Sequence, residues 1–102
     1  MGQPVKVAGK SELREGQGIS VEAAGKRLAI FLVNGSYYAI DDECTHAGGS
    51  LAEGSLRGTT VMCPLHGAEF DITTGKAIGE PADTDVGKYK VVVTGDNIMV
   101  EI

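Results

Sequence analysis

The residues in this chain that can do metal chemistry are concentrated in two short clusters of cysteine and histidine. Cys44 and His46 form the first cluster, and Cys63 and His66 form the second. A spacer of sixteen residues, 47–62, separates them, and the 102-residue chain has no other cysteine or histidine. Thiolate and imidazole are ligands that favour iron–sulfur clusters or zinc over magnesium and calcium. The four side chains therefore predict one shared metal site.

The order of the ligands distinguishes between the two kinds of metal site. Structural zinc sites commonly pair Cys with Cys and His with His, whereas each cluster here supplies one residue of each type. The mixed pattern C-x-H followed by C-x-x-H resembles the Rieske [2Fe–2S] family, in which two His replace two Cys on one iron. A structural Cys2His2 zinc site is the main alternative, and visible absorbance separates the two because zinc is colourless. Two buried cysteines and two unrelated histidines are the remaining possibility.

The resemblance gives a role to each of the four residues. It implies that Cys44 and Cys63 bind one iron of a single [2Fe–2S] cluster. It implies that His46 and His66 bind the other iron. The similarity also covers residues around the second pair, which resemble the second ligand loop and its exit turn: Cys63-Pro64-Leu65-His66-Gly67, Phe70-Asp71 and Thr74-Gly75.

Residues next to the ligands in the sequence imply a low reduction potential. Respiratory Rieske proteins have a disulfide between the ligand loops, but the matching positions here are Gly49 and Leu65. They also have hydroxyl donors after the second His, where this chain has Ala68 and Phe70. A cluster whose sulfurs accept fewer hydrogen bonds is harder to reduce. Rieske proteins commonly cover the cluster with a proline-bearing loop, which Pro81 matches, although an ordinary turn proline fits that position equally well.

Length and composition indicate one small folded domain, residues 1–102. Hydrophobic residues make up 42% of the chain, and 15 glycines indicate many turns. The net charge of −5 argues against nucleic acid as a partner, since phosphate binding needs a basic surface. The N-terminal residues lack a signal-peptide core, and the longest apolar run, 28–33, is too short to span a bilayer. We therefore expect a cytoplasmic protein with no membrane anchor.

The apolar pattern predicts an all-β chain with no helix longer than one turn. Asn34-Gly35 is the strongest hairpin signal, because both central positions of a type I′ turn need positive φ. This turn joins a strand at 27–33, apolar enough to be covered on both faces, to a strand at 36–41. Further strands are expected at 4–7, 19–23, 60–64, 89–94 and 97–102, with one capped helical turn at 11–16. Residues 42–58 are expected to form an irregular metal-binding loop. The resemblance implies an antiparallel β-sandwich or barrel base that carries a small cluster-binding subdomain at about residues 42–78.

Several acidic residues lie close to the predicted ligands in the sequence. Such a group is consistent with a solvated surface. It is equally consistent with a surface that steers docking onto basic patches of redox partners. The residues are Asp41, Asp42, Glu43, Glu53, Glu69 and Asp71.

The pattern predicts an electron carrier rather than an enzyme. Rieske oxygenases add a mononuclear iron site built from two His and a carboxylate, and no histidine remains here once His46 and His66 bind the cluster. The resemblance implies a soluble Rieske ferredoxin that carries single electrons from an NAD(P)H-dependent flavoprotein reductase to a terminal aromatic-ring-hydroxylating oxygenase. One alternative is a small Rieske-fold subunit of a nitrite reductase-like enzyme, against which the intact ligand set counts. A zinc-stabilised binding module is the other.

Overall fold

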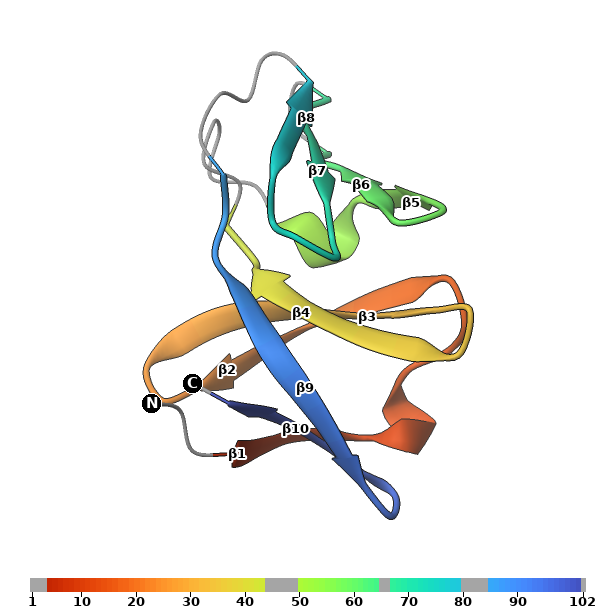
Figure 1. The fold of residues 1–102 in the computed structure, drawn as a ribbon, viewed down its shortest axis with the longest axis vertical. Helices are drawn as coiled ribbons and strands as arrows, with labels where there is room; N and C mark the ends of the chain where they lie inside the picture. The colour runs from red at the N-terminus through yellow and green to blue at the C-terminus, as the bar shows by residue number, and fades with distance from the viewer. Residues whose placement is uncertain (1–3, 44–49, 65–66, 80–84, 102) are drawn as a thin grey trace.

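The computed structural model describes residues 4–43, 50–64, 67–79 and 85–101, which form two antiparallel sheets (Figure 1). The larger, called the base sheet, has the spatial order β1 (Pro4–Gly9), β10 (Asn97–Glu101), β9 (Lys88–Thr94), β4 (Ser36–Asp41), β3 (Lys26–Val33) and β2 (Gln17–Ala23). The smaller, called the small sheet, has the order β5 (Ser55–Arg57), β6 (Thr60–Met62), β7 (Glu69–Asp71) and β8 (Ala77–Gly79). The all-β prediction is confirmed.

The base sheet is close to a closed barrel. Every pair of neighbouring strands is antiparallel, and the two outer strands, β1 and β2, also contact each other. Closure in this manner leaves little open strand edge for unwanted pairing with other chains. The small sheet lies beyond the β3–β4 side of the base sheet, with the short 3₁₀ turn η2 (Leu51–Glu53) between them (Figure 1).

Strand β3 is buried on both faces because it separates two hydrophobic cores. Leu28 and Ile30 face the core enclosed by the base sheet. Ala29 and Phe31 face a second core, which the base sheet shares with the small sheet. All four residues have no solvent exposure, so the expectation of a strand covered on both faces is confirmed. Successive side chains of a strand point to opposite faces, which is why one apolar run can serve two cores.

The hairpin signal at Asn34-Gly35 is also confirmed. Both residues have positive φ, 53° and 79°, as a two-residue type I′ turn requires. The turn fixes the register of the hairpin, in which Val33 pairs with Ser36. The carboxylate of Glu15 accepts hydrogen bonds from both turn amides, at 2.5 and 3.1 Å. The turn amides therefore have a partner other than water.

Three local expectations were wrong. The helical turn expected at 11–16 is a 3₁₀ turn, η1, at Lys10–Glu12. The segment 51–57 was expected to be irregular, but it contains η2 and the strand β5. The second ligand strand ends at Met62 rather than at residue 64. No helix in the described part of the chain is long and apolar enough to cross a membrane.

The second two-residue turn of the base sheet, between β2 and β3, suggests a stability test. Ala24 has φ of 51°, a conformation that carries a steric penalty for alanine and is tolerated by asparagine. We expect Ala24→Asn to stabilise the protein by roughly 0.5–1 kcal/mol, and so to raise the midpoint of thermal unfolding by a few degrees. The reciprocal change Asn34→Ala, at the same position of the other turn, should lower it. Equal midpoints for all three proteins would contradict the strain argument.

Candidate metal centre

One of the four predicted ligands lies among the described residues. Cys63 follows β6 directly and is 1% exposed, within the core that the two sheets share. Cys44, His46 and His66 lie outside the described residues, as do Gly49, Leu65 and Pro81. The described residues on either side of these segments show how the fold holds the predicted ligand positions.

The second ligand pair is carried by the β6–β7 hairpin. Met62 pairs with Glu69 at the end of the ladder. One step further, the Cys63 amide donates a hydrogen bond to the Ala68 carbonyl at 2.6 Å. Gly67 has φ of 72°, a conformation that glycine adopts without steric cost. The hairpin therefore fixes both ends of the C-P-L-H-G sequence.

The residues that flank the first ligand segment, 44–49, are paired with each other. Glu43 and Ser50, on either side of 44–49, form an isolated antiparallel bridge. The Leu51 amide donates a hydrogen bond to the Asp42 carbonyl at 2.7 Å, which extends this pairing. The chain therefore leaves β4 and returns to η2 at one hydrogen-bonded point. Glu43 and Ser50, which flank 44–49, are therefore held next to each other.

The residues that follow the segment containing Pro81 are hydrogen-bonded to the small sheet. The Val86 amide donates to the Gly75 carbonyl at 2.8 Å, and the Ala77 amide donates to the Asp85 carboxylate at 2.8 Å. Gly75 has φ of 79°, and a Cβ atom there would lie 2.3 Å from the Val86 carbonyl oxygen. Only glycine fits this close approach. The chain thus passes directly against the small sheet before it enters β9.

A fully buried carboxylate joins the residues on either side of the first ligand segment to the base sheet. Asp42 has no solvent exposure. One oxygen, Oδ1, accepts the Ala52 amide at 2.9 Å. The other, Oδ2, accepts the Ser20 hydroxyl at 3.1 Å and the Arg27 Nε–H at 2.9 Å. The Ser50 hydroxyl lies 2.9 Å from both oxygens. Residues of β2, β3 and the η2 region thus meet at one side chain.

The acidic group near the ligands was expected to form a surface, and for Asp42 this is wrong. Asp42 is buried, as described above. Asp41 accepts hydrogen bonds from the Gly87 amide at 2.8 Å and the Tyr89 hydroxyl at 2.6 Å. Asp71 accepts the amide and hydroxyl of Thr73 at 2.8 and 2.6 Å. These carboxylates stabilise turns and strand ends. Glu43 and Glu53 are exposed, and Glu69 is half-buried.

The described surroundings of Cys63 fit an iron–sulfur ligand. Ala68 and Phe70 are both fully buried in the same core as Cys63. Such an apolar shell restricts the access of water to a metal site and keeps the local dielectric constant low. Neither side chain can donate a hydrogen bond. The donor set of the chain, two thiolates and two imidazoles, is the set that a Rieske cluster requires.

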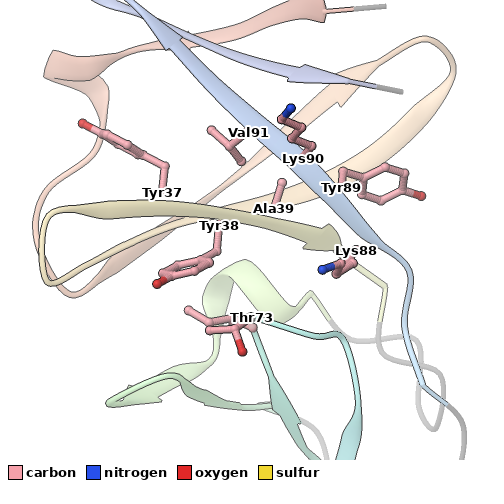
Figure 2. Close-up of a pocket in the computed structure, with 9 residues that line it drawn as sticks. Tyr37, Tyr38, Ala39, Thr73, Lys88, Tyr89, Lys90 and Val91 are labelled. Carbon is pink, nitrogen blue, oxygen red and sulfur yellow. The ribbon is translucent and has the colours of Figure 1, made fainter. Parts of the chain in front are cut away.

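A separate hollow in the structure is not the metal site. A cleft of about 380 Å³ lies where β4 and β9 diverge, since these strands pair only at Ala39–Tyr89 and Ile40–Lys88 (Figure 2). None of the described residues that line the cleft is a cysteine or histidine. They are Tyr37, Tyr38, Ala39, Ile72, Thr73, Lys88, Tyr89, Lys90 and Val91.

Tyr89 suggests a test of how the chain is held at the entrance to β9. Partial burial, together with the hydrogen bond to the Asp41 carboxylate and the charge of that group, raises its pKa from 10.0 to about 12. Because the pKa is raised in the folded protein, the stabilisation is complete below about pH 10 and is lost as pH rises towards 12. In a pH titration, the difference in phenolate absorbance between the unchanged protein and Tyr89→Phe should therefore appear near pH 12. Asp41→Asn should lower that pKa. A transition near pH 10 that is present in the unchanged protein and absent from Tyr89→Phe would contradict this assignment.

Comparisons with known proteins agree with this geometry. The model of the Rieske [2Fe–2S] domain family matches residues 3–90. The ferredoxin component of a naphthalene 1,2-dioxygenase system from Pseudomonas aeruginosa is 36% identical, over 89% of this chain and 88% of that protein.

Solved structures share the whole fold. The ferredoxin of carbazole 1,9a-dioxygenase from Nocardioides aromaticivorans IC177 superimposes with a TM-score of 0.91 at 33% identity, and the match covers 96% of each chain. A chain from a complex of reduced oxygenase and oxidized ferredoxin in carbazole 1,9a-dioxygenase has a TM-score of 0.89 at 33% identity, with coverage of 96% and 92%. From the ligand pattern, the fold and these matches together, this chain belongs to the Rieske [2Fe–2S] family and carries one [2Fe–2S] cluster.

Proposed function

We propose that this chain is the ferredoxin of a multicomponent oxygenase system that hydroxylates aromatic rings. The observation that carries the proposal is the match to dioxygenase ferredoxins, which extends over nearly the full length of both partners. A bound [2Fe–2S] cluster supplies one-electron chemistry. The chain itself positions the ligands and shields one side of the site from water. It is an electron-transfer component and does not catalyse the oxygenation.

In this proposal all four Cys and His residues bind the cluster. Cys44 and Cys63 bind one iron. His46 and His66 bind the other. Support comes from the mixed ligand pattern, from the burial of Cys63 and from the hydrogen-bonded anchors beside each ligand segment. Pro81 is proposed to belong to a segment that covers the cluster, because the chain is tied to the small sheet just beyond it.

The proposed partners are a terminal oxygenase, which takes the electron, and an NAD(P)H-dependent flavoprotein reductase, which supplies it. The solved complex of oxygenase and ferredoxin in carbazole 1,9a-dioxygenase supports the first partner. Of the acidic group near the ligands, Glu43 and Glu53 have the exposure that docking requires. A cytoplasmic location completes the proposal.

The function predicts a spectroscopic signature that depends on the histidines. The purified protein should be red-brown, contain two irons and two acid-labile sulfides, and give a Rieske-type paramagnetic signal when reduced. His46→Ala and His66→Ala should each lose that signal, together with electron transfer from a reductase to an oxygenase. Lys90→Gln, which replaces an exposed lysine, should retain both the paramagnetic signal and electron transfer. Stoichiometric zinc without visible absorbance, in anaerobically prepared protein, would contradict the cluster.

A second prediction concerns the absence of hydroxyl groups beside the cluster. A hydrogen bond to a charged acceptor contributes roughly 1.5–3 kcal/mol, and the difference between redox states is about half of that. Because 59 mV corresponds to a tenfold change for one electron, Ala68→Ser should raise the potential by tens of millivolts, up to about 60. Ala77→Ser is the matched control, since Ala77 packs on the same core from β8.

Phe70→Tyr is a more demanding version of the same change. Phe70 is fully buried, so a hydroxyl added to its ring is removed from water. If that hydroxyl reaches the cluster, the potential should rise as in Ala68→Ser and stability should be preserved. If it does not, the protein should lose roughly 1–3 kcal/mol with no change in potential. Protein-film voltammetry measures the reduction potentials of Ala68→Ser, Ala77→Ser and Phe70→Tyr. An unchanged potential in Ala68→Ser would show that position 68 does not contact the cluster.

A further inference from the structure

Arg27 and Asp42 are cross-strand neighbours at the open end of the β3–β4 hairpin. The ladder ends at Leu28–Asp41, and the next step places Arg27 opposite Asp42. The Asp42 amide donates to the Arg27 carbonyl at 3.1 Å, and the Arg27 Nε lies 2.9 Å from Asp42 Oδ2. The backbone and the side chain of Arg27 are therefore both bound to Asp42. The pair is fixed by the register of the hairpin.

The contacts of Asp42 indicate that its side chain is a carboxylate. Its described partners include a backbone amide and a guanidinium, which can only donate hydrogen bonds, and two hydroxyls that can also donate. Both oxygens can thus act as acceptors. Arg27 is charged at any pH at which proteins are folded. The pair therefore consists of a fully buried negative charge and a positive charge on a side chain that is 49% exposed.

Asp42 precedes the predicted cluster ligand Cys44 by two residues, and Arg27 is bound to Asp42. Two residues of chain span at most about 7 Å, which limits how far Cys44 can be from Asp42. Reduction adds one negative charge to a cluster. A nearby carboxylate opposes that addition and a nearby guanidinium favours it. In the intact pair the two effects largely cancel.

We propose that Arg27, a residue of the base sheet, sets the reduction potential of the cluster by cancelling the charge of Asp42. The proposal rests on Cys44 being a cluster ligand. In this arrangement Asp42 serves as the anchor of the ligand segment, and Arg27 removes the electrostatic penalty that such an anchor imposes on reduction. Both are positioning residues, because they act on the cluster through charge and through the ligand segment.

The test uses single variants whose effects have opposite signs. Arg27→Gln leaves the Asp42 charge uncompensated, so the equilibrium constant for reduction should fall, by roughly two- to fivefold given the partial exposure of Arg27. Asp42→Asn keeps an acceptor for the Ala52 amide and leaves the Arg27 charge uncompensated. In Asp42→Asn the equilibrium constant for reduction of the cluster should rise by roughly three- to tenfold. A tenfold change corresponds to about 59 mV in the reduction potential. The double variant should return close to the original value.

Matched controls separate a local effect from a change in net charge. Lys90 and Glu101 form a 3.9 Å ion pair between β9 and β10, on the base sheet. Lys90→Gln and Glu101→Gln repeat the two charge changes there and should leave the constant nearly unchanged. Arg27→Lys keeps the charge and should keep the original potential. Iron and sulfide content and the paramagnetic signal of every variant show that the cluster is present, and the histidine variants test the function separately.

The decisive comparison is between Arg27→Gln and Lys90→Gln. The proposal is supported if the equilibrium constant for reduction decreases more in Arg27→Gln than in Lys90→Gln, and if Arg27→Lys has a constant close to that of the unchanged protein. Equal effects of Arg27→Gln and Lys90→Gln would overturn it, as would equal losses in Arg27→Gln and Arg27→Lys. If Asp42→Asn releases the cluster, the Arg27 variants still decide the outcome, because the exposed guanidinium can be replaced without removing the other donors to Asp42.

Discussion

The buried carboxylate of Asp42 is the interaction on which the arrangement of the site depends. Burial of an unpaired charge is highly unfavourable, so its position is determined by the donors around it. Those donors come from β2, from β3 and from the chain that returns at Ser50 and Ala52. A buried carboxylate that loses its hydrogen-bond donors is strongly destabilising, so such a cluster of contacts defines local geometry strictly. The segment that follows Asp42 therefore starts from a rigid point.

The two hydrophobic cores on either side of β3 stabilise the surroundings of Asp42. Strand β3 places Leu28 and Ile30 in one core and Ala29 and Phe31 in the other, so the position of the small sheet is set by the same strand that organises the base sheet. Gly18 is part of this arrangement. It pairs with Phe31, and a Cβ atom at residue 18 would lie 2.5 Å from the Phe31 ring. The aromatic side chain thus occupies space that only glycine leaves open.

Sequence reasoning succeeded where the pattern is local. The Asn34-Gly35 turn fixes the pairing of its hairpin, and that register, continued to the end of the strands, places residue 27 opposite residue 42. This signal was present in the sequence, but Asp42 was interpreted as surface because charged residues are seldom buried. The short strand β5 was missed for another reason. It has three residues and pairs with β6, so its formation depends on tertiary contacts that no local pattern reports. The predicted division at about 42–78 remains an interpretation.

The pairing of β1 with β10 has a consequence for how this fold combines with others. Pro4 is paired with Glu101, which brings the first and last described strands side by side at one edge of the base sheet. Partners in an antiparallel ladder are about 5 Å apart. A domain whose ends meet in this way can be placed within a loop of a larger protein, with both connections at one point and little disturbance of the host. The same architecture is therefore suited to serve as a diffusible carrier or as an inserted module.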